Sequence, residues 1–274
     1  MVGLSGTRGC YGIRAACNMS IVAPACRRPR APKPLAIQDR LCDDNTSCEE
    51  QAVWESIMTK VRVSGFSLSA DGFGAGPGQS LADPLGERGE ELHEWLFGTR
   101  TFAEMFGDGR GSADVDDGYA RRSMTGFGAF ILGRNMFGPI RGPWPDQAWK
   151  GWWGDNPPYH APTFVLTHHA RDPIVMEGGT TFHFVTEGIV AALDQARAAA
   201  GGLDVKIGGG VSTVRQYLEA GLVDEMHLAI APIVLGRGEA LFPGLDLAAL
   251  GFVVTERAAT ERAVHLTLAK RAGA

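Results

Sequence analysis

Three glycines in a row, Gly208-Gly209-Gly210, separate an apolar segment from a segment with helical spacing. Residues 205–207, with Val205 and Ile207, predict a buried strand, and Val211, Ser212 and Thr213 open the predicted helix. Because glycine has no Cβ, another backbone or a ligand can approach such a turn closely. The amides at the helix start would point at that ligand, which suits a phosphate. A tight strand-to-helix turn without a ligand is the alternative interpretation.

Two further turns carry polar side chains directly after predicted strands. Their residues are Gly133, Arg134 and Asn135 in one turn, and Thr167, His168, His169 and Arg171 in the other. Ligands of open α/β sheets bind beyond the carboxyl ends of the strands, so we expect these turns to meet at one edge. Two small-residue turns could hold the halves of a dinucleotide, and the hydroxyl and cationic groups suit the extra phosphate of NADP. A surface salt bridge for Arg134 and a solvated histidine pair are the alternatives. Neither spacing offers a metal site.

A sheet must position these turns, and the sequence supplies its strands and helices from residue 58 onward. We expect strands at 61–68, 127–132, 163–167, 182–185, 205–207, 225–230, 251–256 and 263–269, and helices at 87–97, 187–200 and 210–220. This alternation predicts one α/β domain, 58–274, with three α/β/α layers, a mostly parallel mixed sheet and a C-terminal antiparallel hairpin. The Gly- and Asp-rich segment 98–118 is expected to be a loop. The Trp- and Pro-rich segment 138–162 is expected to be a long ordered loop.

Composition excludes several classes of partner. The net charge of −5 argues against a nucleic acid held by electrostatic attraction. The sequence has no apolar run of about 18 residues, so we expect no membrane span. All five cysteines lie within residues 1–48, and their spacing matches no zinc pattern. The cysteine-free main domain is compatible with a reducing compartment, and a cytoplasmic protein is expected.

The first 57 residues differ from the rest of the chain. Residues 1–38 carry basic but no acidic side chains, and the proline-rich stretch 24–34 cannot hold a helix or strand. A disordered tail, a targeting peptide and translated upstream sequence from a misassigned start are three interpretations. We favour the last, with Met58 as the natural start. A secretory signal is disfavoured because no clean apolar segment follows a basic start.

Several motifs, in order along the chain, resemble those of known reductases. Residues 131–137 and 207–210 resemble the Gly-Arg and pyrophosphate-facing segments of dihydrofolate reductases. The runs 222–228 and 232–242, with the opening 69–73, look more specifically like the reductase domain of bifunctional riboflavin-biosynthesis enzymes, the RibD C-terminal type. The resemblance covers nearly the whole domain. The sequence shows no cytidine-deaminase-like zinc motif before the domain, which argues against the bifunctional enzyme itself.

The resemblance implies a dihydrofolate-reductase-like fold and an NADPH-dependent reductase of a pyrimidine or pteridine heterocycle. By this analogy the cofactor-binding residues are Gly133, Arg134, Asn135, Thr167, His168, Gly208, Gly209, Gly210, Val211, Ser212 and Thr213. Ser67, Ser69 and Asp71 would border the nicotinamide and substrate. A homodimer through the C-terminal strands is a further implication. A catalytically silent NADP-binding or interaction protein on the same fold is the alternative function.

Proton delivery and the roof of the pocket are less defined. Dihydrofolate reductases place one acidic residue on the first helix, and we choose Glu91, whose alternative is a solvated helix charge. Asp71 or a bound water is the other candidate proton donor. Trp153 of the Trp-rich segment is expected to stack on the substrate, or to cover the core. Gly209→Val is expected to weaken NADPH binding while the fold survives.

Overall fold

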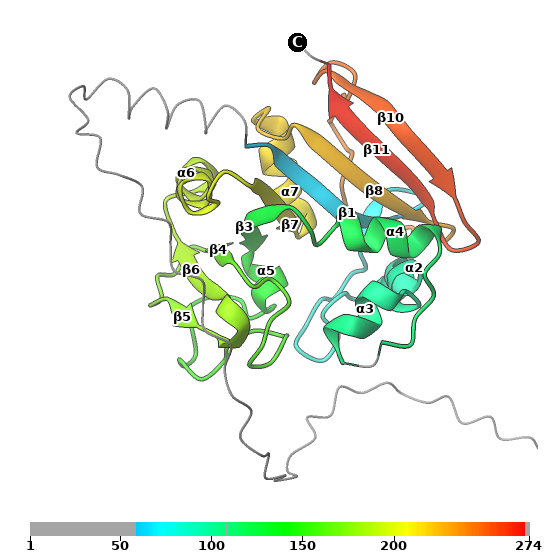
Figure 1. The fold of residues 1–274 in the computed structure, drawn as a ribbon. Helices are drawn as coiled ribbons and strands as arrows, with labels where there is room; N and C mark the ends of the chain where they lie inside the picture. Colours follow the sequence, from blue (N-terminus) through cyan, green and yellow to red (C-terminus); the bar gives the residue numbers. More distant parts are fainter. Residues whose placement is uncertain (1–58, 108, 272–274) are drawn as a thin grey trace, which may run out of the picture. The chain divides into compact units, whose positions relative to one another are not determined.

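The computed structural model describes residues 59–107 and 109–271, which carry a nine-stranded sheet in the order β10-β11-β8-β1-β7-β3-β4-β6-β5 (Figure 1). Neighbours from β8 to β6 run parallel, whereas β11, β10 and β5 add antiparallel pairs. The strands are β1 (Val61–Ser69), β3 (Phe127–Gly133), β4 (Pro162–Leu166), β5 (Ile174–Val175), β6 (Thr181–Val185), β7 (Asp204–Gly209), β8 (Glu225–Ala231), β10 (Phe252–Ala259) and β11 (Val264–Lys270). A small second sheet pairs β2 (Phe73–Ala75) with β9 (Glu239–Ala240).

Helices cover both faces of the main sheet. They are η1 (Gly89–His93), α2 (Glu94–Phe97), α3 (Arg100–Met105), α4 (Val115–Arg122), α5 (Arg134–Phe137), η2 (Glu177–Gly179), α6 (Ile189–Ala199) and α7 (Val211–Glu219). Successive side chains of a strand point to opposite faces. Ile131 therefore joins the core under α6 and α7, whereas its neighbours Phe130 and Leu132 join the core beside α5. Trp95 of α2 and Tyr119 of α4 pack on the same side as α5, over β8 and β11. The predicted three-layer α/β fold with a C-terminal hairpin is confirmed.

The segment 98–118 is not a loop as predicted, because side-chain caps start two short helices in it. Thr99 precedes α3, and its hydroxyl accepts a hydrogen bond from the Phe102 amide at 3.2 Å. Asp114 precedes α4 and accepts from the Asp117 amide at 3.1 Å. Each cap satisfies an amide that has no partner within its own helix. The predicted helix 87–97 is divided into a 3-10 turn, η1, and the single α-turn α2.

The Trp- and Pro-rich segment between α5 and β4 has neither helix nor strand, as the sequence predicts. No helix among residues 59–107 and 109–271 is long and apolar enough to cross a membrane. The predictions for residues 1–57, including a natural start at Met58, lie outside the described residues.

Candidate functional site

The predicted glycine-rich and polar turns meet at one edge of the sheet. Gly209 at the end of β7 pairs with Leu132 of β3, and Gly133 at the end of β3 pairs with Leu166 of β4. On its other side β7 pairs with β1. Because these strands are parallel, their carboxyl ends lie side by side, and the turns that follow them share one edge (Figure 1).

Close packing explains part of the glycine pattern at this edge. A Cβ on Gly133 would lie only 2.3 Å from Thr213 Oγ1, and a Cβ on Gly208 would lie 2.5 Å from a methyl group of Leu132. Gly209 has φ +127°, a conformation that other residues rarely adopt, and its peptide bond to Gly210 is cis. Packing and backbone conformation therefore account for glycine at these three positions.

Gly210 differs from its neighbours, because a Cβ there would meet nothing within 4 Å among the described residues. This glycine is also the N-cap of α7, in an ordinary extended conformation. The first amides of a helix have no partner inside it and carry partial positive charge. A side chain at the N-cap of this nine-residue helix would thus enter open space among the described residues. An anionic group can lie there.

Arg134, the first residue of α5, is held beside the end of β4. Its Nη1 donates a hydrogen bond to Thr167 Oγ1 at 3.2 Å, and its guanidinium lies 3.4 Å from the centre of the Trp144 ring. Nε and Nη2 of Arg134 are buried and have no hydrogen-bond partner among the described residues. Burial, followed by the charge of Arg171, holds the pKa of Arg134 below its ordinary value. Within residues 59–107 and 109–271, this cation has no carboxylate in ion-pair distance and has two nitrogen atoms that donate no hydrogen bond.

A second arginine, Arg171, lies close by and also has a buried nitrogen without a hydrogen-bond partner among the described residues, although the charge of Asp146 partly offsets the lowering of its pKa by burial. Arg171 is only 8% exposed, and its Nε and Nη2 donate to Gln147 and to the Trp149 carbonyl. Its Nη1 is buried without a partner among the described residues. The guanidinium carbon lies 4.8 Å from the ring centre of Trp144, which Arg134 also contacts. Neither arginine has a carboxylate within ion-pair distance in the described part of the chain. Two such cations favour a bound anion.

The remaining predicted cofactor residues lie on the elements and turns beside Arg134 and Arg171. Asn135 is half-buried on α5, and His168 is exposed after Thr167. Neither side chain forms a hydrogen bond within the described residues, so both are free to contact a ligand. At the start of α7, Val211 and Thr213 are buried and Ser212 is exposed. Trp144 was not among the predicted site residues. The sequence offers only one indication of its role, which is that a tryptophan occurs in the segment after Arg134.

Asp71 fastens the end of β1 to the loop after β8. Its carboxylate accepts hydrogen bonds from Ser69 Oγ at 2.6 Å and from the amides of Leu235 and Gly236 at 3.1 and 2.7 Å. The hydrogen bond from Ser69 is the largest cause that lowers the pKa of Asp71. The hydroxyl of Ser69 accepts in turn from the Phe73 amide. The Asp71 carboxylate therefore already accepts three hydrogen bonds from the chain itself.

Glu91 has a comparable structural partner. Its two carboxylate oxygens accept from Nε and Nη2 of Arg88, each at 2.9 Å, and this pairing lowers the pKa of Glu91. Arg88 also donates to the Val234 carbonyl, so Glu91 helps hold the same loop that Asp71 holds. The two carboxylates predicted for proton transfer therefore lie near one loop, on the β1 side of the edge.

The predicted substrate-contacting side chains lie on both sides of the edge. Ser67 is buried on β1, and its hydroxyl accepts a hydrogen bond from Trp95 Nε1 at 2.9 Å. Trp153, in the long loop, stacks on Phe106 with ring centres 6.0 Å apart and meets Tyr159 edge-on at 6.5 Å. Trp153 thus packs against core residues and also contacts the segment after α3.

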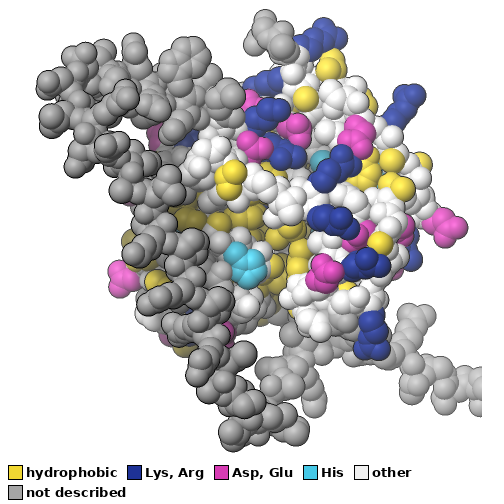
Figure 2. Space-filling model, viewed as in Figure 1, with side chains coloured by type: hydrophobic (Ala, Val, Ile, Leu, Met, Phe, Trp, Pro, Cys, Tyr) yellow, Lys and Arg dark blue, Asp and Glu magenta, His cyan; other side chains and the backbone are white. Residues whose placement is uncertain are grey.

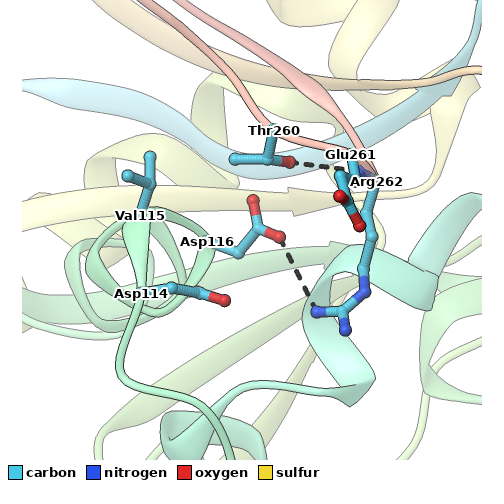
Figure 3. A pocket seen from close by; sticks show the side chains of 6 residues that line it. All are labelled: Asp114, Val115, Asp116, Thr260, Glu261 and Arg262. Atoms are coloured by element: carbon cyan, nitrogen blue, oxygen red, sulfur yellow. Dashed lines mark hydrogen bonds and ion pairs between the residues drawn. The ribbon is translucent and has the colours of Figure 1, made fainter.

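Two cavities lie away from this edge. One of about 340 Å³ opens near the amino ends of β1 and β8, beside α4. The other, of about 230 Å³, lies between the start of α4 and the turn from β10 to β11. Figure 3 shows Asp116 directed toward Arg262 in the smaller cavity, at 3.9 Å. Neither cavity includes a predicted site residue, so the chemistry of the edge does not depend on them.

The fold and the edge define a mostly parallel α/β domain with a glycine-rich turn and unpaired arginines at the strand ends. The family model described as RibD C-terminal domain matches residues 61–269, and the chain belongs to this family. A search of curated proteins found no match.

Solved structures with similarity to the chain include riboflavin-biosynthesis proteins. A putative riboflavin biosynthesis protein from Shewanella sp. PV-4 is 20% identical, with 78% of this chain and 99% of that chain covered and a TM-score of 0.47. A diaminohydroxyphosphoribosylaminopyrimidine deaminase/5-amino-6-(5-phosphoribosylamino)uracil reductase from Thermotoga maritima is 12% identical, with coverages of 78% and 57% and a TM-score of 0.46. Dihydrofolate reductase from Enterococcus faecalis, complexed with NADP(H), is 18% identical, with coverages of 53% and 74% and a TM-score of 0.35.

Proposed function

We propose that this protein is an NADPH-dependent reductase of a pyrimidine or pteridine heterocycle. Membership of the RibD C-terminal domain family supports a reductase-like role, and a similar structure from Thermotoga maritima is described as a deaminase/5-amino-6-(5-phosphoribosylamino)uracil reductase. The proposed substrate class rests on the same similarity to the Thermotoga maritima structure. The residues at the strand-end edge support NADPH as the cofactor.

The observation that carries the proposal is a pair of arginines, the half-buried Arg134 and the buried Arg171, that have no carboxylate within ion-pair distance among the described residues. Arg134 leaves Nε and Nη2 unused, and Arg171 leaves Nη1 unused. A phosphate supplies several anionic acceptor oxygens and matches guanidinium donors well. The hydroxyl of Thr167 lies against Arg134, and Gly210 leaves space at the start of α7. The arginines and Thr167 suit the 2′-phosphate of NADPH. The turn at Gly210, on a neighbouring strand end, suits the pyrophosphate.

Bound NADPH would supply a hydride to a C=N or C=O carbon of the heterocycle. The chain would orient the two reactants and exclude water from them. Asp71 and Glu91 are the candidates for moving the accompanying proton. Because hydrogen bonds lower both pKa values, each is an anion at neutral pH. Either carboxylate would therefore act by orienting a water that delivers the proton, and not as the acid itself.

Asp71 and Glu91 already form hydrogen bonds within the chain, and this favours a second candidate function. A catalytically silent NADP-binding protein needs the arginine pair and the glycine turn but no proton donor. Asp71 and Glu91 would then serve only to hold the loop after β8. The two functions share cofactor binding and differ in turnover.

Fluorescence titration tests the cofactor proposal first. The chain has six tryptophans, and Trp144 contacts Arg134 directly, so binding should change the emission. Charge-assisted hydrogen bonds are worth about 1.5–3 kcal/mol, so NADPH should bind about ten- to a hundredfold more tightly than NADH. Absorbance of NADPH then reports turnover with reduced pteridines and aminouracils. Tight NADPH binding without any turnover would favour the silent protein.

The homodimer remains a proposal that rests on family resemblance. β10 is the edge strand beside β11, and Val254 on it is about half exposed. An exposed edge strand can pair with another chain. Light scattering of the purified protein would give the mass: the value of a dimer supports this proposal, and that of a monomer rejects it.

A further inference from the structure

Trp144, in the Trp-rich segment between α5 and β4, contacts both arginines of the proposed cofactor site. The guanidinium carbon of Arg134 lies 3.4 Å from the centre of the Trp144 ring, and that of Arg171 lies 4.8 Å from it. The electron-rich face of an indole attracts a cation that lies within about 6 Å of the ring centre. One aromatic ring thus attracts both cations.

Hydrogen bonds fix the indole of Trp144 relative to the end of β4. Its Nε1 donates to the His169 carbonyl at 2.9 Å. The His169 amide donates to Thr167 Oγ1, and the same oxygen accepts from Arg134 Nη1, each at 3.2 Å. With the stacking of Arg134 on Trp144, these contacts form a closed circuit of four residues. A rotation of the Arg134 guanidinium would therefore break at least one contact of the circuit.

The circuit leaves one complete edge of the Arg134 guanidinium unused. Nη1 donates to Thr167, whereas Nε and Nη2 are buried and have no hydrogen-bond partner among the described residues. The N–H groups of a guanidinium form a rigid fork that can bind two oxygen atoms of one carboxylate or phosphate. Arg171 adds Nη1, a third buried nitrogen without a partner in the described part of the chain. This arrangement suits an anion with several oxygen atoms.

The Trp-rich segment also fixes Arg171. Nε of Arg171 donates to Gln147 Oε1 at 3.0 Å, and Nη2 donates to the carbonyls of Gln147 and Trp149 at 2.9 and 2.6 Å. All three acceptors are neutral, so they hold the guanidinium in place without compensating its charge. The positions of both arginines therefore depend on residues 144–149 as well as on the strand ends.

Core packing is the other role open to Trp144. Its ring meets Phe137 and Phe184 edge-on, with ring centres 5.8 and 5.2 Å apart. Figure 2 shows mainly hydrophobic side chains around the place of α5 in Figure 1, whereas charged side chains gather over β8, β11 and α4. Packing explains a large apolar side chain at position 144. It does not require the indole N–H that His169 accepts or the ring face that Arg134 covers.

We propose that Trp144 is a positioning residue that holds the Nε and Nη2 edge of Arg134 toward the 2′-phosphate and so determines the preference of the site for NADPH over NADH. The inference rests on the proposed function and adds to it a specificity-determining residue outside the strand-end turns. NADH lacks the 2′-phosphate, so its binding gains nothing from the orientation of this edge. The loss of Trp144 should therefore weaken NADPH binding selectively.

Calorimetric titration of the full chain with NADPH and with NADH tests this proposal. Trp144→Leu keeps an apolar side chain but removes the ring and its N–H, so the ratio of Kd for NADH to Kd for NADPH should fall at least about fivefold. Trp144→Phe keeps a ring but cannot donate to His169, so the ratio should fall about twofold. Trp152→Leu is the matched control. Trp152 lies in the same segment and meets Trp149 edge-on, and its substitution should leave the ratio unchanged.

Three results would overturn the positioning role. They are an unchanged ratio in Trp144→Leu, an equal loss of affinity for both cofactors in this variant, and the same fall of the ratio in Trp152→Leu. The second result would leave Trp144 with packing alone, and the third would assign the effect to the whole segment. If Trp144→Leu does not fold, Trp144→Phe decides, and an unchanged ratio in it rejects the proposal.

Inorganic phosphate separates this inference from the proposed cofactor. In the magnetic resonance spectrum of isotope-labelled protein, phosphate should shift the Arg134 Nε–H signal, which Arg134→Met identifies. Trp144→Leu should raise the Kd for phosphate measured in this way at least about threefold. This result, in a protein that binds NADPH and NADH equally, would reject the cofactor and keep the positioning role. A preference for NADPH that is equal in wild type and Trp144→Leu would do the reverse. Neither a preference nor a phosphate shift in the wild type would reject both.

Discussion

Gly133 and Thr213 approach so closely that a Cβ on the glycine would lie 2.3 Å from Thr213 Oγ1. This contact joins the end of β3 to the first turn of α7, and it holds together the two turns of the proposed cofactor site. Gly133→Ala should therefore destabilise the protein by about 1–3 kcal/mol, because a backbone or a buried side chain must shift. Chemical denaturation measures the loss. Thr213→Ala in the same chain should restore much of it, and equal losses in both backgrounds would contradict the contact.

Gly210 allows binding to be separated from folding. A Cβ there meets nothing within 4 Å among the described residues, so Gly210→Ala should cost no more than about 1 kcal/mol, the penalty of alanine at an N-cap, but should raise the Kd for NADPH at least about tenfold, since the methyl group enters the open space beside the start of α7. Gly118→Ala, also in open space, should leave the Kd unchanged. Unaltered NADPH affinity in Gly210→Ala would remove the pyrophosphate from this turn.

The structure changes the expectation for Gly209→Val. Gly209 has φ +127°, and its Cβ would lie 3.3 Å from the Phe66 ring. A β-branched residue is strained in that conformation, so we now expect the fold itself to be destabilised by the substitution. Thermal unfolding of Gly209→Val beside Gly210→Ala would show the difference. Equal midpoints would mean that the turn tolerates both side chains.

Local patterns predicted the sheet, but long-range partners decided the details of the site. The apolar runs that became β3 and β7 are each followed by glycine, so their ends could be placed from the sequence alone. The helix α3 was missed because the Gly- and Asp-rich composition of 98–118 concealed the cap at Thr99. The engagement of Asp71 could not be predicted either, since its amide donors, such as Gly236, lie more than a hundred residues away.

Lys206 should limit stability at neutral pH. Its Nζ donates to the Ser123 carbonyl, no carboxylate pairs with it among the described residues, and burial lowers its pKa from 10.5 to about 7. The unfolded chain holds this proton up to a higher pH than the folded chain. The loss of folding stability caused by the buried, charged amine is therefore complete below pH 7. It decreases as the pH rises from 7 toward 10.5.

Lys206→Met should remove this dependence and stabilise the protein by about 1–3 kcal/mol at pH 6. Urea denaturation from pH 6 to pH 10 measures both effects. Lys150→Met, at an exposed lysine, is the control and should change stability by no more than about 0.5 kcal/mol. A Lys206→Met protein that is less stable than the wild type at pH 6 would show that the amine contributes favourably.

A buried imidazole pair should make the protein sensitive to acid. The Gly65 amide donates to His227 Nδ1, so His227 carries its proton on Nε2 and donates to His265 Nδ1 at 3.0 Å. His265 Nε2 then donates to Asp116 at 2.9 Å. Burial, followed by the charge of His265, lowers the pKa of His227 to about 3. The folding stability that depends on a neutral His227 is present above pH 6.5, and it is lost as the pH falls toward 3.

One such group contributes a slope of up to about 1.4 kcal/mol per pH unit between pH 6 and pH 4. His227→Gln keeps an acceptor and a donor in place but cannot titrate, so its stability should fall less steeply in this range. Urea midpoints measured at half-unit pH steps give the two slopes. Identical slopes would assign the acid sensitivity to other groups.

In the proposed cofactor site Arg134, with Thr167 and Arg171 beside it, binds the 2′-phosphate of NADPH. The most direct measurement is the ratio of Kd for NADH to Kd for NADPH, by fluorescence titration, in the wild type and in Arg134→Met. We predict a ratio of about 10–100 in the wild type and a ratio near one in the variant, because only NADPH has a 2′-phosphate that loses the Arg134 guanidinium. An unchanged ratio, or an equal loss of both cofactors, would contradict it.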